Sequence, residues 1–278
     1  MQRAIVSSGL KMRVWAVCNQ KGGVGKTTTV ASLAGLLVDR GARVLTIDLD
    51  PHGSLTAYFG LQPEEVAGGG YALFLAHLNR QPVDPLAYLY STPVTGLDLL
   101  PATLALAIVE RQAGTHEGLG LVIQQALLRL KDRYDYALID SPPNLGVLMV
   151  NALAACDYLL IPVMADFLSL RGLERMLHTL HMIGRSRKRE FFYAIVPSLY
   201  DRRPRVSSES LKILRERYGD RLWPGAIPVD TKLREASQAH LPISQYCPAC
   251  RAVLAYTALL DFVLEAEQLQ RSTQVLSA

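Results

Sequence analysis

The chain has 278 residues, half of them hydrophobic, so it is long enough to bury the core of one large α/β domain. Its net charge of +4 is too small by itself to indicate a nucleic-acid binder. Four cysteines are too few for a disulfide framework, and no apolar run approaches the roughly 18 residues of a membrane helix. We therefore expect a cytoplasmic protein without a membrane anchor.

A glycine-rich loop stands between a predicted strand at 14–17 and a predicted helix that begins near Thr27. A phosphate-binding loop needs this order of strand, loop and helix. Its glycines bring backbone N–H groups close to phosphate oxygens, and the helix N-terminus adds positive potential. We expect Lys26 to neutralise the outer phosphates and the Thr27 hydroxyl to bind Mg²⁺. The loop residues expected to contact a nucleotide are Gly22, Gly23, Val24, Gly25, Lys26, Thr27 and Thr28.

Two aspartates, Asp48 and Asp50, stand at the end of the second predicted strand, residues 43–48. The carboxyl edge of the strands is where α/β sheets bind their ligands. This position favours a role for Asp48 near Mg²⁺ and a role for Asp50 in orienting an attacking water. The alternative is that both acids only form the turn before Pro51.

A third acid, Asp140, ends the apolar strand predicted at 136–139 and is followed by the turn Ser141-Pro142-Pro143. A single acid after a buried strand is typical of the second metal-side motif of nucleotide hydrolases. Asp140 is therefore expected to hold Mg²⁺, directly or through water. The alternative is a strand-end acid that caps a turn.

Further elements extend this alternation of strands and helices. Strands are predicted at 97–100, 157–163 and 191–196, and helices at 71–79, 119–130, 167 to about 184 and 251 to about 270. The pattern predicts a single α/β domain at 12–270, with a mostly parallel central sheet and helices on both faces. Met12 is a second candidate start, so 1–11 is expected to be a short N-terminal extension and 271–278 a C-terminal tail.

Basic residues gather in the second half of the chain, beginning with a run at 185–189. The candidates for contact with DNA are Arg202, Arg203, Arg205, Lys232 and Arg234. No recognition helix or zinc pattern accompanies them, so binding to the phosphate backbone would be non-specific and sensitive to salt. The alternative is a solvated charged face.

Cys247 and Cys250 form a C-x-x-C pair just before the last predicted helix. Such a pair can bind zinc or an iron–sulfur cluster, or carry out thiol chemistry. The chain supplies no two further ligands near it in sequence, so a four-ligand site would need two chains. The alternative is a pair of small buried residues at a helix start.

The segment 21–27 resembles K-G-G-x-G-K-[ST], the variant phosphate-binding loop of the ParA/MinD class of ATPases. It departs from the general G-x-x-x-x-G-K-[ST] pattern because Gln20 replaces the first glycine. The segment 48–54 resembles the D-x-D-P-Q-x-N switch of that class, with His52 and Ser54 in place of the usual Gln and Asn.

Two later segments carry the same resemblance, which spans about 12–265. Residues 140–143 are similar to the motif D-[ST]-P-P, and 227–236 resembles the segment I-P-x-x-x-x-x-x-E-A that lies beside the adenine. The resemblance implies that Pro228 and Asp230 belong to the adenine side of the site. The usual Arg-Asn after the proline is replaced here by Val229-Asp230.

The resemblance implies a P-loop ATPase that binds ATP and Mg²⁺ between two subunits and hydrolyses ATP slowly until a partner stimulates it. In this class the extra lysine, here Lys21, reaches the partner's nucleotide, and the second switch acid, here Asp50, is tied to hydrolysis. The output is a switch between an ATP-bound homodimer and an ADP-bound or nucleotide-free monomer.

The resemblance also implies a cargo, which the switch positions in the cell. The form of the 48–54 segment resembles the ParA-like proteins that place chemotaxis arrays at cell poles, ahead of those that segregate chromosomes or plasmids. The activating partner would be a chemotaxis-array adaptor or a ParB-like protein, and the location polar or on the nucleoid. Two alternatives stay open: a P-loop iron–sulfur carrier with Cys247 and Cys250 across a dimer, and a nucleotide-binding scaffold with negligible turnover.

Overall fold

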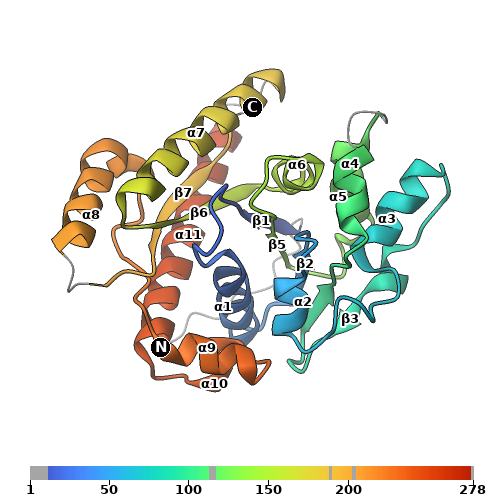
Figure 1. Ribbon diagram of the computed structural model, residues 1–278, viewed down its shortest axis with the longest axis horizontal. Helices are drawn as coiled ribbons and strands as arrows, with labels where there is room; N and C mark the ends of the chain where they lie inside the picture. Colours follow the sequence, from blue (N-terminus) through green and yellow to red (C-terminus); the bar gives the residue numbers. More distant parts are fainter. Residues whose placement is uncertain (1–11, 113–116, 188–189, 202–204, 277–278) are drawn as a thin grey trace.

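A seven-stranded sheet with the order β3-β4-β2-β5-β1-β6-β7 forms the centre of the protein (Figure 1). The computed structural model describes residues 12–112, 117–187, 190–201 and 205–276. The strands are β1 (Arg13–Val17), β2 (Val44–Asp48), β3 (Tyr90–Ser91), β4 (Leu97–Leu100), β5 (Tyr136–Asp140), β6 (Tyr158–Met164) and β7 (Tyr193–Ser198). Neighbouring strands are parallel except for β3 and β4. The predicted α/β fold with a mostly parallel sheet is confirmed.

The sheet is buried on both faces, which is why its central strands read as continuous apolar runs. Along β1, Trp15 and Val17 pack into one core, while Val14 and Ala16 pack into the core on the opposite face. Helices cover each core. Those on the β1 Val14 face are α3 (Gly69–Leu78), α4 (Leu106–Gln112), α5 (Val122–Leu130), α6 (Val147–Ala155), α7 (Phe167–Arg187) and α8 (Arg205–Tyr218). Those on the Trp15 face are α1 (Lys26–Asp39), α2 (Ser54–Tyr58), α9 (Thr231–Gln238), α10 (Ile243–Tyr246) and α11 (Arg251–Leu276).

Several element boundaries differ from those expected from the sequence. Strand β7 begins at Tyr193 because its pairing with β6 starts there, opposite Leu159. Helix α7 continues to Arg187, and so includes Gly184, although a glycine inside a helix costs about 1 kcal/mol relative to alanine. Residues 119–121 form a 3-10 turn ahead of α5. No helix in the described part of the chain is long and apolar enough to cross a membrane.

The last helix is tied to the first strand by a buried carboxylate. Glu267 of α11 is only 4% exposed. Its two oxygens accept hydrogen bonds from Arg13 Nη1 at 2.8 Å and from Trp15 Nε1 at 2.7 Å. Both donors lie on β1, the strand that leads directly into the glycine-rich loop, so α11 fixes the base of that loop.

Candidate functional site

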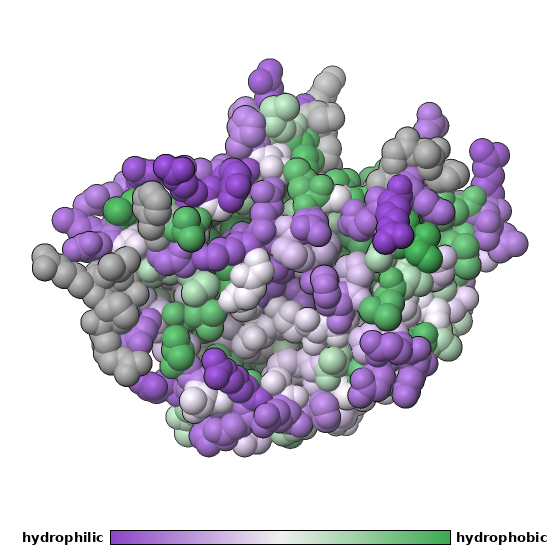
Figure 2. Space-filling view, viewed as in Figure 1, coloured by the Kyte–Doolittle hydropathy of each residue, from purple (hydrophilic) through white to green (hydrophobic). Residues whose placement is uncertain are grey.

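The glycine-rich loop lies at the carboxyl end of β1, between that strand and α1 (Figure 1). Gly23 and Gly25 adopt φ values of 72° and 87°, in the left-handed region that favours glycine. The loop is anchored on both sides: Asn19 Nδ2 donates to Pro162 O at 2.6 Å, and Ser198 Oγ donates to Val24 O at 2.8 Å. The ends of β6 and β7 therefore hold the loop with its first helical turn open toward a ligand. Figure 2 shows this face of the molecule hollowed at its centre.

The two loop lysines have different surroundings. Lys26 is buried, with Nζ 3.4 Å from Lys21 O, so its ammonium group lies back over the loop. Lys21 Nζ points away from the loop to Asp166 Oδ2 at 3.0 Å and Ser169 Oγ at 2.8 Å. Because Ser169 and Lys21 both donate to Asp166, the pKa of that carboxyl is lowered, although burial opposes the shift most strongly. In the isolated chain Lys21 is therefore held by the carboxyl end of β6.

Thr27 and Asp140 meet at the same sheet edge. Thr27 Oγ1 donates to Asp140 Oδ2 at 2.6 Å, while Asp140 Oδ1 is buried and has no hydrogen-bond partner among the described residues. Burial raises the pKa of Asp140, and the nearby Asp48 raises it further. A buried carboxylate oxygen beside a hydroxyl is a ligand set that suits Mg²⁺, which prefers hard oxygen ligands. These two residues therefore fit the expected metal.

Asp48 is also buried, but its oxygens are occupied within the chain. Oδ2 accepts from both Thr56 N and Thr56 Oγ1 at 2.8 Å, and Oδ1 accepts from Asp50 N at 3.1 Å. Burial nevertheless raises the pKa of Asp48 to about 6. Asp48 therefore stabilises the loop between β2 and α2. Its charge also acts on Asp140, which lies opposite it on the neighbouring strand β5. A metal role for Asp48 remains a prediction.

Asp50, the expected water-orienting acid, follows the carboxyl end of β2 and has a side chain that is 14% exposed. Its Oδ1 accepts from His52 N at 3.0 Å and lies 2.8 Å from His52 Nδ1. The histidine side chain is 82% exposed. Oδ1 is thus held by His52, and this contact orients the carboxylate.

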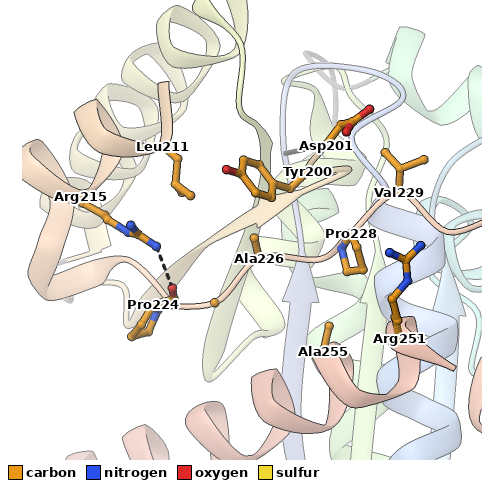
Figure 3. Close-up of a pocket in the computed structure, with 11 residues that line it drawn as sticks. Tyr200, Asp201, Leu211, Arg215, Pro224, Ala226, Pro228, Val229, Arg251 and Ala255 are labelled. Carbon is orange, nitrogen blue, oxygen red and sulfur yellow. Dashed lines mark hydrogen bonds between the residues drawn. The ribbon is translucent and has the colours of Figure 1, made fainter. Parts of the chain in front are cut away.

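A cavity of about 840 Å³ lies between α8 and the start of α11 (Figure 3). Of the two residues expected beside the adenine, Pro228 lines the cavity. Asp230 instead caps helices: Oδ1 accepts from Lys232 N at 3.0 Å and Oδ2 from Ala252 N at 3.3 Å. Tyr200, Val229 and Arg251 are further lining residues, and Figure 3 shows Arg251 beside Pro228 and Val229.

The structure describes only some of the residues predicted to contact DNA. Arg202 and Arg203 lie outside the described residues, and for Arg205 the structure defines only its place at the start of α8. Lys232 and Arg234 lie exposed on α9, where Lys232 Nζ pairs with Glu235 Oε2 at 2.7 Å. Lys232 thus has part of its charge neutralised within the chain. The DNA surface remains a prediction.

The cysteine pair lies between α10 and α11, and both thiols are partly exposed. They were expected either as ligands or as small buried residues. No group of three or more histidine, cysteine, aspartate or glutamate side chains that could hold a metal occurs in the described parts of the chain. One chain therefore offers two cluster ligands there, so the iron–sulfur carrier, which needs both cysteines from each of two chains, remains a prediction.

Comparison with known proteins identifies the family. A protein-family profile described as an AAA domain matches residues 12–192. The chain is 32% identical to the sporulation initiation inhibitor protein Soj of Bacillus subtilis over 89% of its length and 96% of that protein. It is 34% identical to the chromosome partitioning protein ParA of Caulobacter vibrioides over 92% of its length and 96% of that protein. The chain belongs to the ParA/Soj family of P-loop ATPases.

Solved structures agree with this ParA-type fold. A structure titled cobyrinic acid a,c-diamide synthase from Mycobacterium smegmatis, with bound ADP and magnesium, matches with a TM-score of 0.77 and 32% identity. The match covers 92% of this chain and 96% of that one. Cyanothece McdA without nucleotide matches with a TM-score of 0.77 at 24% identity, over 89% of this chain and 99% of that one, and supports the fold alone. The expected cofactors, ATP and Mg²⁺, are of the kind bound in the M. smegmatis structures.

Sequence reasoning missed two parts of this ParA-type site. Asp166 follows the end of β6, so the rule that selected Asp48 and Asp140, an acid at the carboxyl end of a strand, also selects it. Tyr200 and Arg251 carry no such signal. They lie 51 positions apart along the chain and reach one cavity only because α11 returns across the sheet.

Proposed function

We propose that this chain is an ATP hydrolase that binds ATP with Mg²⁺ over the carboxyl ends of β1 and β5. The observation that carries the proposal is the hydrogen bond between Thr27, which is half-buried, and the buried Asp140, whose Oδ1 has no hydrogen-bond partner among the described residues and can bind a ligand. When bound there, Mg²⁺ would neutralise phosphate charge. Lys26 and the loop N–H groups would hold the outer phosphates, and the first turn of α1 would add its positive end.

Asp50 supplies the remaining chemical role in this proposal. It lies two residues beyond the end of β2, at the carboxyl edge of the sheet, where its carboxylate can accept a hydrogen bond from an attacking water. The contact between Asp50 Oδ1 and His52 leaves Oδ2 for that water. Asp50 therefore orients the nucleophile, and His52 orients Asp50.

Lys21 connects hydrolysis to assembly. In the proposed ATP-bound homodimer, this lysine leaves Asp166 and Ser169 and reaches the phosphates bound by the partner subunit. The exchange of one anionic partner for another supports a two-state switch, because the lysine is paired in both states. We propose that the ATP dimer is the active state and that hydrolysis returns the chain to the monomer.

We further propose that the switch positions a cargo with the help of an activating protein. The name of the C. vibrioides relative, chromosome partitioning protein ParA, favours chromosomal DNA, either as cargo or as the surface on which the dimer moves. A chemotaxis array at the pole is the other cargo and rests on the form of the 48–54 segment alone. The proposed contact with DNA consists of Arg202, Arg203, Arg205, Lys232 and Arg234.

The central test measures phosphate release and oligomeric state together. Wild-type protein with ATP and Mg²⁺ should release phosphate and form dimers in light-scattering chromatography, and with ADP it should be monomeric. Lys26→Ala should lose nucleotide binding, Lys21→Ala should bind nucleotide but not dimerise, and Asp50→Ala should dimerise without turnover. Lys131→Ala, which removes an exposed lysine at the end of α5, is the matched control. Equal turnover in wild type and Asp50→Ala would contradict the proposal.

A second test addresses DNA. Binding to non-specific duplex DNA is measured with ATP, with ADP and without nucleotide, each at two salt concentrations. We expect binding only with ATP, and we expect salt to weaken it because released counterions drive the association. Binding that is equal in all three nucleotide states would contradict a switch that controls DNA contact.

A further inference from the structure

The C-x-x-C segment forms a tight turn between two helices. Cys247 N donates to Ile243 O at 2.9 Å, which ends α10, and Leu254 N donates to Cys250 O at 3.3 Å, which begins α11. Between them Cys250 N donates to Cys247 O at 3.1 Å and closes the turn. Pro248 and Ala249 at its tip are exposed. The other two cysteines are buried elsewhere, Cys18 after β1 and Cys156 after α6.

This turn brings the two thiols within reach of each other. A four-residue turn holds its end Cα atoms within about 7 Å, and disulfide-bonded cysteines have Cα atoms about 4.4–6.8 Å apart. Burial raises the pKa of Cys250, and the Cys247 thiol raises it further. Burial thus disfavours the thiolate of Cys250, and Cys247 is taken as the thiol that attacks first.

The same turn adjoins the cavity between α8 and the start of α11, here called the base-side cavity because Pro228, expected beside the adenine, lines it. Arg251, the residue after Cys250, lines that cavity together with Pro228 and Val229. The next residue, Ala252, donates its N–H to Asp230 Oδ2 at 3.3 Å, and this is the contact that joins α11 to the loop containing Pro228. A change in the turn therefore reaches the cavity wall through two consecutive residues.

We propose that Cys247 and Cys250 are a redox-modification site, a dithiol that is reversibly oxidised to a disulfide and so alters the first turn of α11. The oxidant is a low-molecular-weight disulfide such as oxidised glutathione. The Cys247 thiolate attacks one glutathione sulfur and releases one glutathione. Cys250 then loses its proton to solvent and attacks the mixed disulfide at Cys247, which releases the second glutathione. Two protein thiols become one disulfide, and one oxidised glutathione becomes two reduced molecules.

The first measurement follows the disulfide itself. Folded full-length chain is equilibrated in glutathione buffers of increasing oxidation, quenched by thiol alkylation and weighed by mass spectrometry. We expect one internal disulfide between Cys247 and Cys250 that dithiothreitol reverses. Cys156→Ser should behave as wild type, while Cys247→Ser and Cys250→Ser should not form it. A stable glutathione adduct on Cys247 that Cys250 does not resolve would overturn the proposal, as would zinc or iron retained by both thiols after anaerobic purification.

The second measurement follows the effect on α11 and the cavity. Hydrogen exchange of the amides at the start of α11 should accelerate in oxidised chain, because the contact between Ala252 and Asp230 is weakened. Binding of a fluorescent ATP analogue with Mg²⁺ should weaken several-fold, and dithiothreitol should restore it. Unchanged exchange would overturn the coupling. The affinity readout rests on the proposed function, but the mass and exchange readouts do not, so reduced chain that binds no nucleotide would contradict only the proposed function.

Discussion

The phosphate end and the base end of the proposed nucleotide site are built differently. The phosphate end consists of loop glycines in the left-handed backbone region and the buried carboxylate of Asp140. Asp140 Oδ1 has no protein partner in the described part of the chain. At the base end, the side chain expected to meet the nucleotide is already used, because Asp230 caps both α9 and the start of α11. The phosphate end keeps an acceptor atom available for a ligand, whereas Asp230 at the base end mainly stabilises the starts of two helices. Substitutions should therefore affect catalysis at the first end, and affinity and stability at the second.

The largest effect is expected for Asp140→Asn. We expect hydrolysis to fall by about 100-fold or more, since a preorganised charge at the reacting phosphate is lost. The free energy of unfolding of nucleotide-free protein should not fall, because burial already disfavours the charged form of this carboxyl. Steady-state phosphate release tests the loss of hydrolysis, and thermal unfolding tests whether the free energy of unfolding is maintained. Asp157→Asn, at the opposite end of the sheet where the carboxylate accepts from Val14 N, is the control.

The pH dependence of stability offers a second test of the phosphate end. The pKa of Asp48 rises from its ordinary 3.8 to about 6, so the folded state binds more protons than the unfolded state between these values. Stability should therefore be highest below about pH 4 with respect to this group and fall as the pH rises through about 6. Melting curves of nucleotide-free protein should show this loss, and Asp140→Asn should reduce it, because Asp140 is a second buried carboxyl with a raised pKa and its own contribution to the loss is removed. An identical pH profile in both proteins would contradict the raised pKa of Asp140.

At the base end, Asp230→Ala should act on affinity and stability. The loss of two helix caps should lower the free energy of unfolding by about 1–2 kcal/mol. The KM for ATP should rise several-fold while kcat stays within about twofold, because the reacting phosphates are untouched. Asp84→Ala is the matched control, since Asp84 caps the 3-10 helix Pro85–Tyr88 through Leu86 N. A fall in kcat as large as that of Asp140→Asn would break the contrast between the two ends.

The smallest effect is expected for His52→Gln. Glutamine keeps the backbone N–H bond to Asp50 and replaces only the ring contact at 2.8 Å. Loss of one solvent-exposed hydrogen bond is worth about 1 kcal/mol or less, which corresponds to a change in kcat of about fivefold or less. Single-turnover hydrolysis measures this change in rate. His77→Gln on α3 is the control, because the ring of His77 contacts Glu117 O away from the loop lysines and acids, and it should not change the rate.

The two ends also differ in how far the sequence could predict them. Lys26, Thr27 and Asp140 follow from local pattern, since a strand that ends in a glycine loop or in an acid places these groups at one sheet edge whatever the rest of the chain does. Asp230 caps α9 through the nearby Lys232 N, but its second capping contact is with Ala252, which is 22 positions away and on another helix. The pairing of Lys21 with Asp166 depends on β6 lying next to β1. Local pattern cannot contain such contacts, because the packing of distant segments creates them.

The tie between Glu267 and β1 has a consequence for how the protein is made. The strand that carries the phosphate loop pairs with β5 and β6, which follow it by more than 100 residues, and its Arg13 and Trp15 find their carboxylate only in the last helix. During synthesis, β1 must therefore leave the ribosome long before its neighbours exist. Such distant pairing slows folding and leaves the loop unformed until late. A nascent chain should gain the ability to bind nucleotide only when almost all of it has been translated.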